Sequence, residues 1–170
     1  MKYFIGVPIP KNYKTKIEML RAEIKFFTTE TNITLIHTKA LPDDDSFVKK
    51  VIEVCKNTKS FQITLDKLGQ FGKRVLYVGV NSTELIQLHD NIYGELNLEA
   101  EKRAHTPHLT IVKQRPGRTV DIDAIKKRAE TMLIPCPKFI LSSIVVYSQP
   151  KEKSIYVPYM VIPLKDTEPI

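Results

Sequence analysis

The chain has 170 residues, of which 42% are hydrophobic and 26% charged, and a formal net charge of +7. The composition is typical of a globular protein, and the chain is long enough to bury a sizeable core. The apolar start is broken at Pro8 and Pro10, and no later stretch is long enough for a membrane span. We therefore expect one cytoplasmic, monomeric domain over residues 1–170, without a membrane partner and with an anionic ligand.

Disulfide frameworks, glycine-rich nucleotide-binding motifs and metal sites are not expected. Cys55 and Cys136 are too few for a disulfide framework and do not form a CxxC pair. The sequence has no phosphate-binding glycine loop, no dinucleotide-binding glycine cluster and no spacing typical of metal ligands. We therefore expect a function that needs neither a cofactor nor a metal.

Strand and helix periodicities alternate along the chain. The first half predicts a strand at 3–9, a helix at 12–27, a strand at 31–38, a helix at 43–57 and strands at 61–68 and 74–80. The second half predicts a helix at 83–96, a strand at 108–113, a helix at 121–133 and strands at 139–147 and 154–162.

This order can be divided into two similar units, residues 11–80 and 83–163. The first strand lies before both units. If the units pack about a pseudo-twofold axis, their middle strands face each other across a groove. The expected fold class is therefore α+β, with two lobes, two antiparallel sheets, helices outside and a central groove.

The sharpest local motif is Thr106-Pro107-His108-Leu109-Thr110, at the start of one middle strand. Residues two apart on a strand point to the same face, so His108 and Thr110 project together. A histidine can transfer a proton near neutral pH, and a threonine hydroxyl can bind a phosphoryl oxygen. The other middle strand carries a partial copy, Asn32-Ile33-Thr34, 76 positions upstream.

With these motifs the sequence resembles the two-histidine (2H) phosphoesterases, which include the LigT-like RNA 2′,3′-cyclic phosphodiesterases. The segments that carry the likeness are Tyr3 to Pro10, Thr34 to Asp44, Leu68 to Gly72, Arg74 to Val80 and Pro107 to Thr110. The resemblance implies that His108 is a general acid or base and that Thr110 and Thr34 hold the phosphate.

The chain departs from the family at its first histidine, where Asn32 stands. An amide does not titrate near neutral pH, so Asn32 cannot be the second acid or base, although it can still bind substrate. His37 lies nearby, but on a regular strand it points away from Thr34. Only a bulge or a slipped register would bring His37 into the groove.

A basic rim and aromatic rings complete the candidate site. The basic side chains around the second motif are Arg103, Lys113, Arg115 and Arg118. The rings that could stack on a base are Tyr3 or Phe4 and Tyr147, although each could instead pack in the core. His105 could reach the groove or lie solvated in a loop, and His89 is expected to be structural.

Three functions remain open from the sequence. The chain could be an enzyme that hydrolyses an RNA-like or cyclic nucleotide phosphodiester. It could instead be a catalytically impaired binding protein that sequesters a cyclic oligonucleotide or an RNA end. It could also keep the fold only as an interaction scaffold, since a fold alone does not determine function.

Overall fold

The computed structural model describes residues 1–25, 31–117 and 119–166. Its strands form two four-stranded antiparallel sheets, with the orders β2-β1-β7-β8 and β5-β4-β3-β6. The helices are α1 (Lys11–Glu23), α2 (Val48–Lys56), α3 (Thr83–Glu95) and α4 (Ile122–Leu133), with 3₁₀ turns at Thr38–Ala40 and Asp45–Phe47. The strands are β1 (Lys2–Val7), β2 (Ile33–Ile36), β3 (Phe61–Phe71), β4 (Val75–Asn81), β5 (His108–Lys113), β6 (Lys138–Leu141), β7 (Ser143–Gln149) and β8 (Val157–Pro163).

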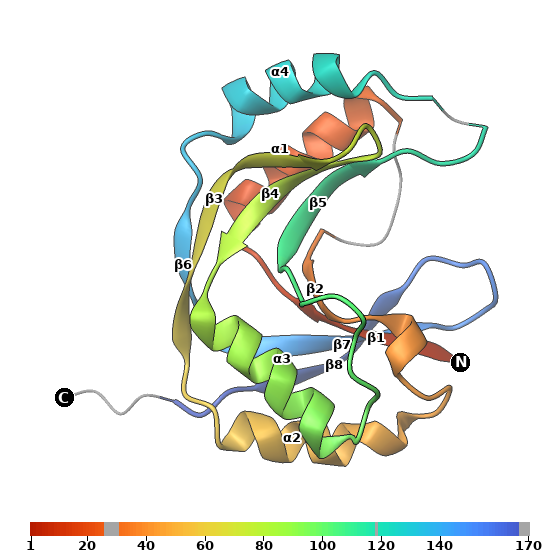
Figure 1. Ribbon diagram of the computed structural model, residues 1–170, viewed down its shortest axis with the longest axis vertical. Helices are drawn as coiled ribbons and strands as arrows, with labels where there is room; N and C mark the ends of the chain where they lie inside the picture. The colour runs from red at the N-terminus through yellow and green to blue at the C-terminus, as the bar shows by residue number, and fades with distance from the viewer. Residues whose placement is uncertain (26–30, 118, 167–170) are drawn as a thin grey trace.

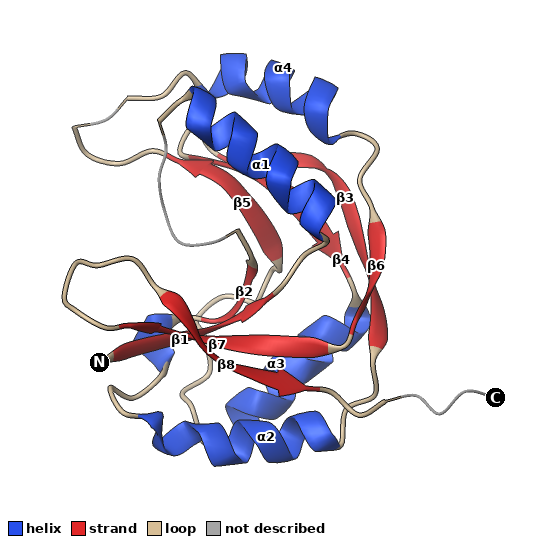
Figure 2. Cartoon of the chain, turned by 180° about the vertical axis from the view of Figure 1, so that it is seen from behind, coloured by secondary structure: helices blue, strands red, loops and turns tan. Residues whose placement is uncertain are grey.

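Each sheet and the two helices outside it form one lobe (Figure 1). The helices α2 and α3 pack together, with α2 against β8 of the first sheet, and α1 and α4 pack together against β5 and β4 of the second. Figure 2 shows both helix pairs on the outer sides of the molecule. Because α1 follows β1 but packs on the other sheet, each half of the sequence contributes to both lobes. The expected α+β, two-lobed fold is confirmed.

Local sequence signals explain where the helices begin. Ser82 caps α3 by accepting a hydrogen bond from the Leu85 amide, and Asp121 caps α4 by accepting one from the Ala124 amide. The predicted helix at 43–57 instead opens with a 3₁₀ turn, in which Asp44 accepts from the Ser46 amide. The predicted helix at 12–27 ends at Glu23, and Phe27 lies outside the described residues.

The predicted strand at 139–147 is wrong as one continuous element. It divides at Ser142 into β6, which pairs with β3, and β7, which pairs with β1 in the other sheet. The chain therefore passes from one lobe to the other within a single apolar run. Periodicity could not predict this division, because alternation shows which side of a strand is buried but not which strand it pairs with.

The first sheet buries side chains on both faces. Tyr3, Ile5 and Val7 of β1 belong to the main core, while Phe4 belongs to a smaller buried cluster with Val145 and Tyr147. Strand alternation places Gly6 on the Phe4 side of the sheet. Among the described residues, no helix has the length and apolar character of a transmembrane span.

Candidate functional site

The two motif strands, β2 and β5, are the edge strands of the two sheets and approach each other between the lobes (Figure 1). Thr34 from β2 and His108 from β5 line the same pocket, which has a volume of about 340 Å³. Its other lining residues are His37, Phe71, Glu101, Arg103, Ala104, His105 and Thr106. The pocket therefore contains one member of each sequence motif.

The ring of His108 is held in a defined orientation. Its Nδ1 lies 2.9 Å from the carbonyl oxygen of Thr106, which can only accept a hydrogen bond, so Nδ1 carries a proton. Phe71 and Tyr77 pack edge to face with the ring, at centroid distances of 5.1 and 5.6 Å. Nε2 is thus the ring nitrogen left to exchange a proton with a ligand.

Both motif strands contain a β-bulge directly after the motif threonine. Thr34 pairs with Gly6 but Ile36 pairs with the adjacent Ile5, so Leu35 is an additional residue on β2. On β5, Thr110 pairs with Tyr77 and Val112 with the adjacent Leu76, so Ile111 is additional. The two additional residues are 76 positions apart, as are Asn32 and His108. The two strands therefore share one local geometry.

The bulge on β2 changes where His37 points. An additional residue reverses the alternation beyond it, so Ile36 joins the core and His37 returns to the face of Thr34. His37 accordingly lines the pocket with Thr34 and His108. The regular-strand expectation for His37 is wrong, and the bulged alternative applies. Burial of part of the ring, with a smaller contribution from His108, lowers the pKa of His37 below its ordinary value.

Asn32 lies directly before β2 and is half-buried. A Cβ atom added to Gly6 would come within 2.7 Å of the Asn32 side-chain oxygen and 2.9 Å of a ring carbon of Tyr147. Because Gly6 has no side chain, the Asn32 amide can occupy the space beside it. Asn32 is not one of the residues that line the pocket.

The structure corrects the expectation for Tyr3. Its side chain is 5% exposed, lies in the main core and packs against Phe47 and Tyr159, on the face of β1 opposite to Gly6. The alternation of β1 instead places Phe4 on the side of the motif threonine. Phe4 stacks on Tyr147 at a centroid distance of 4.7 Å, and Tyr147 is itself buried.

The remaining predicted residues differ in whether they line the pocket. Arg103 lines it, whereas Thr110 and Lys113 on β5 do not. Lys113 is exposed, and its charge helps to lower the pKa of His37. Arg115 is exposed in the loop after β5, and Arg118 lies outside the described residues.

Sequence reasoning missed Arg21, which connects the two motif strands. This α1 side chain is 8% exposed and donates hydrogen bonds to the hydroxyl of Thr31 and to the carbonyl oxygens of Thr110 and Ile111. The available signal was its place four residues after Ile17, on the buried stripe of the helix. Burial lowers the pKa of the guanidinium to about 10, which leaves it charged at neutral pH.

Comparisons with known proteins give the family and the fold. The sequence profile of the 2′-5′ RNA ligase superfamily matches residues 31–152. E. coli LigT is 18% identical in its crystal structures with 3′-AMP and with NADP⁺, which have TM-scores of 0.65 and 0.64 and cover 96% of this chain and 97% of that one. TT0787 of Thermus thermophilus is 12% identical over 98% of this chain and 99% of that one, with a TM-score of 0.66.

These structural likenesses establish the fold, and the profile match covers most of the chain, including both motif strands. None of the curated proteins matches the chain by sequence. The chain belongs to the 2′-5′ RNA ligase superfamily, the 2H phosphoesterases.

Proposed function

We propose that the pocket binds an RNA-like or cyclic nucleotide phosphodiester and hydrolyses it slowly, without a metal at the reacting phosphate. The observation that carries this proposal is the bulge at Leu35, which brings His37 into the pocket of His108. Thr34 and Arg103 line the same pocket and supply a hydroxyl and a positive charge for phosphoryl oxygens. The proposed reaction uses two of the imidazoles that line this pocket, His37 and His108, and two groups for the phosphate, Thr34 and Arg103.

In the proposed reaction, His37 is the base and His108 is the acid. The lowered pKa of His37 keeps its ring neutral at neutral pH, so it can take a proton from the attacking water. The water oxygen bonds to phosphorus, the bond from phosphorus to the leaving ribose oxygen breaks, and protonated His108 gives that oxygen its Nε2 proton. His37 is then protonated by the proton from water and His108 is neutral, its own proton being on the leaving oxygen, and proton exchange with solvent restores both rings.

The phosphate ligands of related structures support the substrate class. Crystal structures of E. coli LigT hold 3′-AMP, NADP⁺ and phosphate. For this chain we propose a ligand of the same chemistry, either an RNA end with a cyclic phosphate or a cyclic oligonucleotide. A net charge of +7 attracts such an anion toward the protein at long range.

A second candidate function is binding without turnover, and Asn32 favours it. The amide stands where the other motif has its histidine and cannot transfer a proton at neutral pH. A protein of this kind would sequester a cyclic oligonucleotide signal or an RNA end. The two functions differ in whether product forms from a bound ligand.

The proposed function is tested by following binding and product together with 2′,3′-cyclic, 2′-5′-linked and cyclic oligonucleotides. The variant Thr34→Val removes the hydroxyl that lines the pocket and keeps the size and branching of the side chain. It should weaken binding by about 1–3 kcal/mol in calorimetry. The matched control Thr131→Val, on the exposed side of α4, should bind like the parent. Unchanged affinity in Thr34→Val would contradict the assignment of the pocket.

A further inference from the structure

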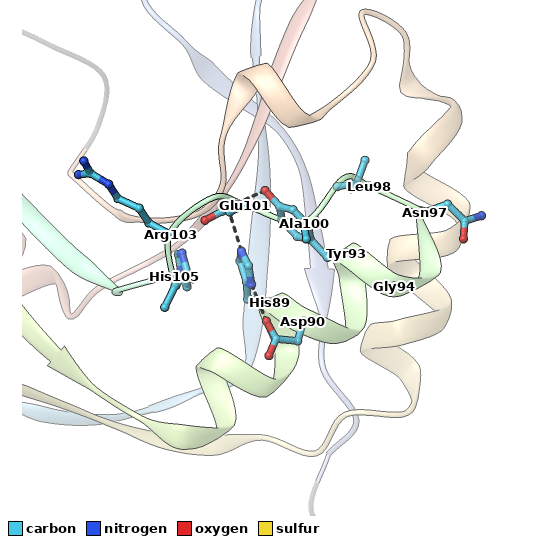
Figure 3. A pocket seen from close by; sticks show the side chains of 11 residues that line it. His89, Asp90, Tyr93, Gly94, Asn97, Leu98, Ala100, Glu101, Arg103 and His105 are labelled. Atoms are coloured by element: carbon cyan, nitrogen blue, oxygen red, sulfur yellow. Dashed lines mark hydrogen bonds and ion pairs between the residues drawn. The ribbon is translucent and has the colours of Figure 1, made fainter.

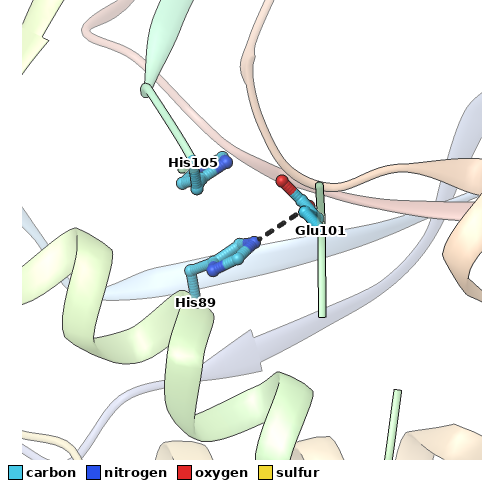
Figure 4. A group of neighbouring side chains, drawn as sticks. All are labelled: His89, Glu101 and His105. Carbon is cyan, nitrogen blue, oxygen red and sulfur yellow. Dashed lines mark hydrogen bonds and ion pairs between the residues drawn. The ribbon is translucent and has the colours of Figure 1, made fainter. Parts of the chain in front are cut away.

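A second group of polar side chains lies next to the proposed reaction pocket. His89 comes from α3, while Glu101 and His105 come from the irregular segment between α3 and β5 (Figure 4). One potential ligand atom from each of the three residues lies within 4.8 Å of the others. The group lines a pocket of about 550 Å³ (Figure 3), and His105 also borders the pocket of His108.

His89 lies between two carboxylates and is 4% exposed. Its Nδ1 is 2.9 Å from a carboxylate oxygen of Asp90, and its Nε2 is 3.3 Å from a carboxylate oxygen of Glu101. If Asp90 accepts the Nδ1 proton of a neutral ring, the lone pair of Nε2 faces Glu101. That contact is attractive only when a proton or another cation lies between the two atoms.

Glu101 offers a negative charge to this group. Burial acts to raise its pKa, but the hydrogen bond from Tyr93 and the interaction with the neighbouring His89 outweigh burial and lower the pKa below its ordinary value. The Tyr93 hydroxyl donates to the same Glu101 oxygen at 2.6 Å. The carboxylate is therefore ionised at neutral pH and fixed in place by Tyr93.

His105 contributes a second imidazole. Its ring stacks on that of His89 at a centroid distance of 3.9 Å and an interplanar angle of 4°. Its Nε2 is buried and has no hydrogen-bond partner among the described residues. Burial and the neighbouring His89 lower the pKa of His105 to about 4, so the ring is neutral at pH 7. A neutral imidazole has a lone pair to give to a cation.

We propose that His89, Glu101 and His105 bind one Zn²⁺ ion. Two imidazole nitrogens and one carboxylate oxygen are a ligand set that zinc accepts, with bonds of about 2.0–2.2 Å. Asp90 occupies the position of the carboxylate that orients a metal-binding histidine through its other nitrogen. For zinc to bind, the donor atoms, which now lie within 4.8 Å of one another, must come closer together, and the His105 ring must turn out of its stack on His89.

The ion would fix one wall of the reaction pocket to α3. Glu101, Arg103 and His105 all line that pocket and lie within the segment that the ion would hold. The proposed acid and base, His108 and His37, are outside the ligand set, so the ion organises the wall without touching the reacting phosphate. Sequence spacing did not predict this site, because its ligands come from a helix and a loop in no recognised metal-binding pattern.

The test is titration of the metal-free, full-length protein with ZnCl₂, followed by calorimetry and native mass spectrometry. We expect one bound ion and no comparable binding of Mg²⁺, which prefers oxygen ligands. His105→Asn and Glu101→Gln should each weaken zinc binding at least ~10-fold, which is the lower end already found for loss of a residue that only orients a metal ligand. His108→Asn is the matched control and should bind zinc like the parent.

Three results would overturn the proposal: no zinc bound by the parent, equal affinity in His105→Asn, or loss of binding in His108→Asn. The last would place the ion in the pocket of His37 and His108 instead. Because His89 is buried and its replacement could prevent folding, the test relies on His105→Asn, with its fold verified by circular dichroism. Co²⁺ gives a second readout, since the visible absorption of the parent complex should be lost in His105→Asn.

Discussion

At the scale of single residues, position 32 decides how fast the site can work. Asn32→His would place an imidazole at the counterpart of His108 on β2, in the space that Gly6 leaves open. We expect hydrolysis of a 2′,3′-cyclic substrate to rise at least ~10-fold, the low end of what a positioned acid or base contributes. Single-turnover rates measure this, with calorimetry to verify comparable affinity. A variant that folds and binds but is no faster than the parent would contradict the assignment of this position.

The titration of His37 should set the acid side of the pH profile. Its pKa is lowered below the ordinary value of 6.5, and the ring must be neutral to act as a base. On the acid side of the profile, activity should therefore be lost as the pH falls through the lowered pKa of His37. The measurement is kcat/KM against pH for the parent and for His37→Gln, in which this acid limb should disappear. An acid limb that persists in His37→Gln would belong to another group.

At the scale of elements, Arg21 of α1 holds the start of β2 and the bulge of β5 together. Arg21→Lys keeps a positive charge but loses the planar fork that reaches Thr31, Thr110 and Ile111. We expect a loss of about 1–3 kcal/mol in the free energy of unfolding, because buried acceptors lose their donors. Urea denaturation followed by circular dichroism measures this loss.

The control for Arg21 is Arg128→Lys on the surface of α4. Arg128 pairs with Glu23 at 2.9 Å, but both side chains are exposed, so its replacement should leave the free energy of unfolding nearly unchanged. If the two lysine variants were equally stable, Arg21 would not be the connection between the motif strands. A weaker nucleotide affinity in Arg21→Lys alone would further show that this connection shapes the pocket.

The elements also show what a single sequence can and cannot predict. The strand at His108–Lys113 was predicted with its observed bounds, because its motif begins after a proline and alternates from His108 to Ile111. The bulges at Leu35 and Ile111 were not predicted, since a bulge depends on the partner strand as well as on the strand itself. The position of His37 followed from one such bulge, and that is why sequence alternation placed it on the wrong face.

At the scale of the whole molecule, the order of helices and strands and the two-lobed architecture were predictable from periodicity and from the family resemblance. The exchange of segments between lobes was not. The helix α1 leaves the sheet of β1 for the other lobe, and Ser142 divides one apolar run between the two sheets. These crossings bring β2 and β5 together, so the pocket depends on contacts between residues that are distant in sequence.

The central claim is that His37 and His108 act as a pair on a bound phosphodiester. The most direct measurement is product formation from a 2′,3′-cyclic nucleotide by the parent, by His37→Gln and by His108→Gln, at saturating substrate and with binding measured in parallel. The account predicts slow but measurable turnover by the parent and a loss of about 10²-fold or more in each variant, with substrate still bound. Turnover by His37→Gln at the rate of the parent would contradict the account.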